Sequence, residues 1–107
     1  MNYPRESELV DFFGVDPTRD GEVLCFTVSS EHGLSLTVSM NEADDSLQTT
    51  LLHSGKTIAV VCQEGLSQLR IVDGAMRGEF LRDGLRIVMS LKFQPHMRLE
   101  WSGLRTI

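Results

Sequence analysis

The feature that most constrains the fold of this chain is an alternation of apolar and polar residues over 22–102. In LSLTVSM (34–40), for example, every second residue is apolar and the residues between are serines and a threonine. A period of two is typical of β-strands that bury one side of a sheet and expose the other. We therefore expect this segment to form β-structure.

Short turn sequences rich in Gly, Asp, Ser and Pro divide the segment into about eight strands. Such short connections are typical of antiparallel neighbours, so the pattern predicts an antiparallel β meander. Strands of this number and length form a curved sheet, a partial barrel or a sandwich. The predicted strands are 22–30, 34–42, 46–53, 57–64, 67–72, 75–81, 85–93 and 97–102.

The segment before the strands has a different period. RESELVDFF (5–13) places its apolar residues on one helical stripe and its acidic residues opposite, and Gly14 follows where a helix commonly ends. This pattern predicts one short helix over 5–13. The fold class is thus mainly β with one N-terminal helix. A length of 107 residues suits a single domain, 1–107.

The sequence also indicates the cellular compartment in which the protein is expected. The N-terminal residues lack the basic and then apolar pattern of a secretory signal, and no apolar run approaches the length of a membrane span, roughly 20 residues. We expect a soluble cytoplasmic protein without a membrane partner. Cys25 and Cys62 both lie in strand-like runs, which favours reduced thiols in a core over a disulfide.

Charge is unevenly distributed along the chain, whose net charge is −5. Residues 1–50 contain ten Asp and Glu but two Arg, whereas residues 51–107 contain five Asp and Glu but eight Lys and Arg. An acidic half would repel phosphate, so we expect no nucleic-acid partner there. It suits a basic protein surface better.

In a strict meander, alternate turns lie at opposite ends of the sheet. This rule predicts an acidic rim, which could dock a basic protein, and a second rim that gathers the histidines. The predicted partner-binding residues are Asp20, Glu22, Glu42, Asp44, Asp45 and Glu64, with Asp16 and Asp83 at the same rim. The predicted histidine rim contains His32, His53 and His96 with Asp73.

Both predicted rims also have a simpler interpretation, in which their residues have no binding function. Asn41, Asp44 and Asp45 suit a solvated turn for reasons of turn chemistry alone. The histidines lack the local spacing of zinc ligands, NEADDS lacks the plan of a calcium loop, and no phosphate-binding glycine motif occurs. We therefore predict no catalytic residue, no metal and no cofactor, and a protein that is not an enzyme.

The later strands carry a row of basic residues that predicts a basic outer sheet face. Aromatic residues do not alternate with them, which favours a solvated face or a contact with an acidic partner over a single-stranded nucleic-acid platform. The residues are Arg70, Arg77, Arg82, Arg86, Lys92 and Arg98.

In size, charge and β-rich layout the whole chain resembles small bacterial toxin-immunity proteins. The resemblance rests on no motif, so it assigns no family residue to this chain. It implies an inhibitor that covers the basic active site of a cognate toxin, such as a nuclease. Two alternatives are a homo-oligomeric structural or accessory domain, for example a homodimer that pairs acidic and basic halves, and a small β-barrel that binds an apolar ligand.

Overall fold

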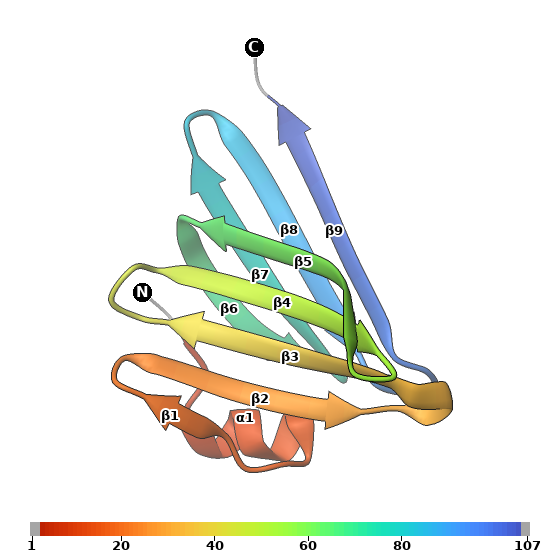
Figure 1. Ribbon diagram of the computed structural model, residues 1–107. Coiled ribbons are helices and arrows are strands. Elements are labelled where there is room, and N and C mark those ends of the chain that lie inside the picture. The colour runs from red at the N-terminus through yellow and green to blue at the C-terminus, as the bar shows by residue number, and fades with distance from the viewer. Residues whose placement is uncertain (1–2, 106–107) are drawn as a thin grey trace. The chain divides into compact units, whose positions relative to one another are not determined.

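A computed structural model describes residues 3–105, and their side chains except those of Glu31, Leu104 and Arg105. One α-helix precedes the described strands, and a short 3-10 turn lies among them (Figure 1). The elements are α1 (Glu6–Phe13), β1 (Thr18–Asp20), β2 (Val23–Ser29), η1 (Glu31–Gly33), β3 (Leu34–Asn41), β4 (Ser46–His53), β5 (Lys56–Glu64), β6 (Leu66–Val72), β7 (Ala75–Arg82), β8 (Leu85–Lys92) and β9 (Arg98–Arg105).

The strands form two antiparallel sheets. Five strands pair in the order β1-β2-β3-β4-β5, and four pair in the order β6-β7-β8-β9. The prediction of a mainly β protein with one N-terminal helix is confirmed, and all eight predicted strands are present. The sheets do not close into a barrel, so the geometry that the ligand-barrel alternative requires is not formed.

Strand β1 was not expected from the sequence, since its three residues are too few to show an alternation. It pairs with β2, with Thr18 opposite Cys25 and Asp20 opposite Val23.

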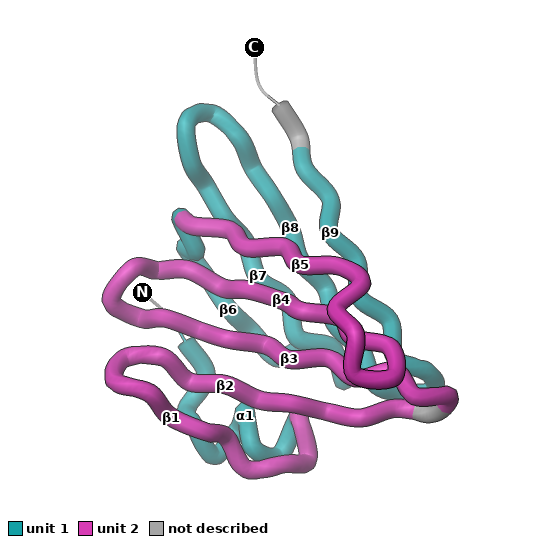
Figure 2. The backbone as a smooth tube through the Cα atoms, viewed as in Figure 1, with its two compact units in different colours: residues 1–12, 65–107 teal, residues 13–64 magenta. Residues whose placement is uncertain are grey.

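The chain divides into two compact units (Figure 2). Residues 13–64 contain the five-stranded sheet, and residues 1–12 together with 65–107 contain most of α1 and the four-stranded sheet. The sequence-based prediction of a single domain stays a prediction. Among the described residues, no helix has the length and apolar character needed to cross a membrane.

Helix α1 begins and ends as the sequence indicates. The Glu8 side chain reaches back to the start of the helix, where its Oε1 accepts hydrogen bonds from the Arg5 backbone N–H and from Arg5 Nε, both at 3.2 Å. The backbone bond, followed by the side-chain bond, lowers the pKa of Glu8 below its usual 4.5. Gly14 follows the last helical residue with a φ of +73°, a conformation that glycine adopts without steric cost.

The five-stranded sheet buries one of its faces. Phe26, Val38 and Thr49 are neighbours across β2, β3 and β4, and all three are buried. Phe13 stacks on Phe26 with ring centroids 4.4 Å apart. On the opposite face the strands carry small polar residues, including Thr27 and Thr37, whose hydroxyls share a 3.0 Å hydrogen bond. The alternation in the sequence therefore separates a dry from a wet face, as predicted.

The four-stranded sheet follows the same rule. Leu69, Gly78 and Met89 are neighbours across β6, β7 and β8, and all three are buried. Phe80 packs against Trp101 with ring centroids 5.5 Å apart, which extends the apolar face to β9. The other buried apolar residues of this sheet are Leu66, Met76 and Leu91.

Gly65 separates the two sheets along the chain. Its φ is +85°, and a Cβ at this position would lie 2.7 Å from the carbonyl oxygen of Leu81. The Leu81 backbone N–H also donates a 2.9 Å hydrogen bond to the Gly65 carbonyl. Both the positive φ and the close backbone approach require glycine here.

The two cysteines are free thiols, but only one fits the expectation of a core position. Cys25 is half-buried, and its Sγ shares a 3.1 Å hydrogen bond with Ser39 Oγ. Cys62 is exposed on β5, which corrects the expectation that both thiols are buried. The strand-like sequence around Cys62 could not reveal that β5 lies at a sheet edge.

Candidate functional site

The six predicted partner-binding residues lie at one end of the five-stranded sheet. The last rung of this sheet runs from Asp20 through Val23, Asn41 and Ser46 to Glu64. At a strand spacing of about 4.8 Å, this rung is roughly 19 Å wide. We call this region the acidic end; it consists of Asp20, Glu22, Glu42, Asp44, Asp45 and Glu64. Asp20 and Glu64 lie at its two corners.

A structured turn holds the middle of the acidic end. Asn41 Oδ1 accepts a 3.0 Å hydrogen bond from the Ala43 backbone N–H, and Asn41 Nδ2 donates a 3.2 Å hydrogen bond to Asp44 Oδ2. Asp45 has a φ of +50°, a conformation that aspartate tolerates better than most residues. The Asn41 side chain thus organises the turn that presents the three neighbouring carboxylates.

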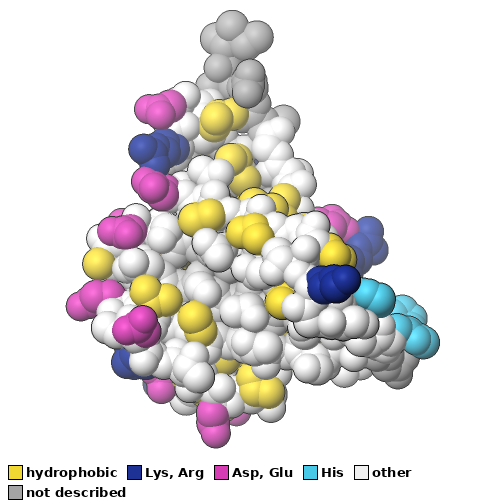
Figure 3. All heavy atoms as spheres, in the orientation of Figure 1, with side chains coloured by type: hydrophobic (Ala, Val, Ile, Leu, Met, Phe, Trp, Pro, Cys, Tyr) yellow, Lys and Arg dark blue, Asp and Glu magenta, His cyan; other side chains and the backbone are white. Residues whose placement is uncertain are grey.

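The carboxylates of the acidic end are accessible. Asp45 is half-buried and the other five residues are exposed. In Figure 3, acidic side chains gather at the left, where β3 and β5 end in Figure 1, while histidine side chains lie at the right. The chemistry of the acidic end is therefore that of several solvent-accessible carboxylates gathered at one end of the sheet.

Two further acidic residues predicted at the same rim, Asp16 and Asp83, are not part of this end of the five-stranded sheet. Asp16 precedes Thr18, which lies opposite Cys25, so the chain at Asp16 leads away from this end of the sheet. Asp83 belongs to the other unit, in the turn between β7 and β8. The rule of alternate turns failed for Asp16 because β1 is an additional strand, while the assignment of Asp83 to the acidic rim stays a prediction.

Two of the three histidines predicted to share a rim lie together at one end of the five-stranded sheet. His53 lies opposite Leu34, and the Ser54 backbone N–H donates a 2.9 Å hydrogen bond to the Gly33 carbonyl, so His32 and His53 lie at the same end of the five-stranded sheet. His96 lies in the other unit, in the loop between β8 and β9. Among the side chains that the structure describes, which exclude Glu31, no three from His, Cys, Asp or Glu are grouped in a way that could hold a metal ion.

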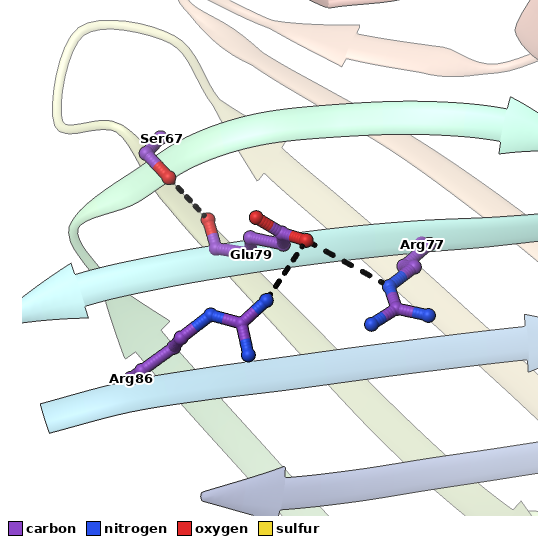
Figure 4. A network of polar contacts seen from close by, with 4 residues as sticks. All are labelled: Ser67, Arg77, Glu79 and Arg86. Atoms are coloured by element: carbon purple, nitrogen blue, oxygen red, sulfur yellow. Dashed lines mark hydrogen bonds and ion pairs between the residues drawn. The ribbon is translucent and has the colours of Figure 1, made fainter. Parts of the chain in front are cut away.

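The predicted basic outer face exists on the four-stranded sheet, but carboxylates divide it (Figure 4). Glu79 Oε1 lies 3.2 Å from the terminal nitrogen of Arg86 and 3.8 Å from Arg77 Nε. Arg98 pairs with Glu100 on β9. Arg82 lies on the side of the strand that carries Phe80, because residues two apart share a face, so the prediction for Arg82 is wrong.

Strand β5 is a surface that the analysis of charge and motifs missed. Ile58 is 57% exposed and Val60 is 53% exposed, although both belong to a strand of strong β propensity. Residues 57–63 contain no charged residue, while Lys56 and Glu64 flank them. This uncharged run was the available sequence signal, but without the sheet order it could not be distinguished from a buried central strand.

Comparisons with known proteins find a similar fold but no similar sequence family. No protein-family model matches the chain, and no curated protein matches its sequence. Among solved structures, the two-sheet fold matches one chain with a TM-score of 0.82, and the match covers 94% of this chain and 95% of that chain at 22% sequence identity. The matched structure is a contact-dependent growth inhibition toxin–immunity protein complex from Klebsiella pneumoniae 342. The structural neighbour is therefore a chain of a complex that contains a toxin and its immunity protein.

Proposed function

We propose that this chain is an immunity-type inhibitor, which binds a cognate toxin and blocks it by covering the toxin's active site. The observation that carries the proposal is the likeness in fold, over nearly the whole of both chains, to a chain of a toxin–immunity complex. Inhibition by occlusion needs a folded surface of suitable shape and charge and no chemistry of its own. We propose accordingly that the chain is not an enzyme and that it acts in the bacterial cytoplasm.

The acidic end is the proposed toxin-binding surface. Its carboxylates come from three separate segments of the chain, at Asp20–Gly21–Glu22, at 42–45 and at Glu64, and the sheet register brings them to one end. A concentration of negative charge attracts a basic protein over several ångströms and selects against acidic ones. A toxin that acts on nucleic acid would present Lys and Arg of the kind that hold phosphate.

The Asn41-centred turn supports this assignment on energetic grounds. Because Asn41 already fixes Ala43 and Asp44, less conformational entropy is lost when a partner orders the turn. The same hydrogen bonds also explain a turn that has no partner. Charge reversal at Glu42, Asp44 and Asp45 separates docking from turn chemistry, because it leaves Asn41 in place.

The negative charge of the acidic end also suits an inhibitor better than a toxin. We therefore propose that this chain is the inhibitor of such a pair. An acidic sheet end would repel a phosphate-bearing substrate but would attract the basic site of an enzyme that binds one. Expression of the chain alone tests this choice directly. Normal growth of the expressing cells is expected, whereas growth arrest would assign the chain to the toxin side.

The docking test compares three baits in affinity capture from source-cell lysate: the native chain, a variant with Glu42→Lys, Asp44→Lys and Asp45→Lys, and a matched control. The control carries Asp11→Lys, Asp16→Lys and Asp73→Lys, which makes the same change in net charge at exposed residues outside the acidic end. Asp73 also matches Asp45 in backbone conformation, with φ values of +53° and +50°. Circular dichroism verifies that all three baits are folded.

A protein captured by the native chain and by the control, but lost by the acidic-end variant, is then expressed on its own. The proposal expects it to arrest growth, and expects co-expression of the native chain to restore growth. Reversal of charges that are desolvated at an interface costs about 2 to 5 kcal/mol of binding free energy, enough to abolish protection. Protection that survives the triple substitution would place the toxin-binding surface elsewhere.

A further inference from the structure

Strand β5 is one of the two edge strands of the five-stranded sheet. This nine-residue strand pairs with β4 on one side. Eight of its residues are exposed, and its apolar side chains are exposed on both faces of the sheet: Val60 aligns with Thr50, and Val61 aligns with the buried Thr49. An exposed, apolar edge of this length is a template on which another strand can add.

The other edge strands of the two sheets carry the devices that prevent such addition. Strand β1 has three residues, two of them charged. Strand β6 contains Arg70, and β9 contains Arg98 and Glu100. Charged residues and short length normally protect an edge. In β5 the charges are confined to the two ends, Lys56 and Glu64, and the interior 57–63 has none.

The sequence of β5 is complementary to itself when the strand runs antiparallel to a second copy. With Val60 opposite Val60 of the partner copy, Lys56 lies opposite Glu64 of the partner copy, and Ala59 opposite Val61. The two-fold axis then repeats both Lys–Glu pairs, while apolar residues fill the centre. Cross-strand pairs of opposite charge and of β-branched residues are the pairs that stabilise antiparallel strands.

We propose that β5 is a self-association surface, through which two copies of this chain join their five-stranded sheets across a two-fold axis at Val60. Such an interface is isologous and closed, because each copy contributes the same strand and no free β5 edge remains. A pair of strands is small for an interface, so the dimer exchanges with monomer at moderate concentration. The proposal does not rest on the toxin-binding proposal, although the two surfaces share Glu64, which lies at a corner of the acidic end.

One irregularity limits the pairing to part of the strand. The register between β4 and β5 shifts at Leu51 and Leu52, so that Thr57 faces Leu52 while Ala59 faces Leu51, and Ile58 is the extra residue. Bulges bend the strand that contains them. The regular part, 59–64, includes the axis, so regular backbone pairing is confined to 59–61 of both copies. The Lys56–Glu64 pairs lie beyond the bulge and depend on contact between their long side chains.

Disulfide trapping at the axis is the first test. Residues directly opposite in antiparallel strands have Cα atoms about 4.5 to 5.5 Å apart, within the range that a disulfide bridges. Val60→Cys in a Cys25→Ser, Cys62→Ser background should therefore form a covalent dimer under mild oxidation. Val72→Cys in the same background is the control, since Val72 is also an exposed valine on an edge strand, with 49% exposure. Equal cross-linking of the two variants would overturn the proposal.

A charge exchange then tests the register. Lys56→Glu places Glu opposite Glu at both ends of the dimer, and Glu64→Lys places Lys opposite Lys. Each single variant should dimerise about tenfold more weakly than the native chain, while an equimolar mixture should recover the native affinity, because both ends of the mixed dimer carry opposite charges. Sedimentation equilibrium from about 1 µM to about 1 mM covers the expected range. Failure of the mixture to recover would overturn this register.

High salt separates this dimer from one held by acidic and basic surfaces. An association centred on apolar residues persists at high ionic strength, whereas one held by exposed charges dissociates. The native chain should therefore still exceed its monomer mass of 12.0 kDa in about 1 M salt. Full dissociation in salt, or a monomer at every concentration, would overturn the proposal.

Discussion

The two sheets place their charges in different ways. In the five-stranded sheet, carboxylates are concentrated at the acidic end, in turns and at the ends of strands. The strands themselves carry many hydroxyl side chains. In the four-stranded sheet, charges lie within the strands on the outer face, where Glu79 contacts Arg77 and Arg86. Within these strands Glu79 lies between two arginines, although Arg70 faces Arg77 across the register, whereas the charges in the turns of the acidic end have one sign. The first arrangement suits recognition of another protein, and the second stabilises the sheet that carries it.

The largest expected effect comes from the core and tests whether the sheets unfold as one domain. Phe26→Ala and Phe80→Ala each remove a buried ring, at a cost of roughly 3 to 5 kcal/mol in unfolding free energy. Trp101 fluorescence reports on the four-stranded sheet, while far-ultraviolet circular dichroism reports on both sheets. If the chain is a single domain, Phe26→Ala lowers the midpoint of both signals equally.

A fluorescence midpoint that stays at the native value in Phe26→Ala would contradict the single domain. Phe26→Leu serves as a milder version for use if the alanine variant does not fold. The same pair of signals applied to Phe80→Ala completes the comparison between the sheets.

The next largest loss of stability is expected at Gly65, which lies between the two sheets along the chain. Gly65→Ala should lower the unfolding free energy by about 2 kcal/mol, because it combines a positive φ with a Cβ only 2.7 Å from the Leu81 carbonyl oxygen. Gly55→Ala is the matched control: its φ is +80°, and a Cβ there meets nothing within 4 Å. Urea denaturation should show a smaller loss in the control, and equal losses would remove the backbone approach as the cause.

A smaller change in stability distinguishes the paired charges of the four-stranded sheet from the like charges of the acidic end. Glu79→Gln should lower the unfolding free energy by about 0.5 to 1 kcal/mol at low salt, because two arginines lose their carboxylate partner. Glu42→Gln should leave it unchanged or raise it slightly, because it removes one of several like charges. Both differences should diminish when salt screens the charges. Losses of the same size in both variants would contradict the contrast between the sheets.

The smallest effect is at the N-terminus of α1. The hydrogen bonds from Arg5 lower the pKa of Glu8, so the ionised carboxylate stabilises the folded chain. This contribution is complete above the usual pKa of 4.5 and is lost as the pH falls through the lower pKa of the folded state. In urea denaturation at several pH values, the difference between native and Glu8→Ala should be constant near neutral pH and should shrink below pH 4.5. A pH-independent difference would assign the effect to helix propensity.

Much of the fold could be predicted because its signals are local. The period of two identifies strands, Gly and Asp identify turns, and Gly14 marks the end of the helix; each depends only on neighbouring residues. The six residues of the acidic end were grouped correctly for the same reason, since hairpins joined by short turns fix which turns share an end. The toxin-binding role of this group remains a proposal.

The errors have a common physical origin, which is that sequence does not state which strands lie at edges. One continuous meander was expected through the break at Gly65, where the structure instead begins a second sheet. Cys62 was expected in a core because an edge strand and a central strand of apolar residues have the same composition.

The sequence by itself therefore determined the strands, the helix, the alternation of faces and the acidic turns, because these follow from the stereochemistry of adjacent residues. Only the tertiary structure decided that the strands divide at Gly65 into sheets of five and four, and that β5 ends one of them. Sheet membership depends on hydrogen bonds between segments distant in sequence, whose balance no local pattern contains. That decision left Ile58 and Val60 exposed, and with them the surface on which the proposed dimer depends.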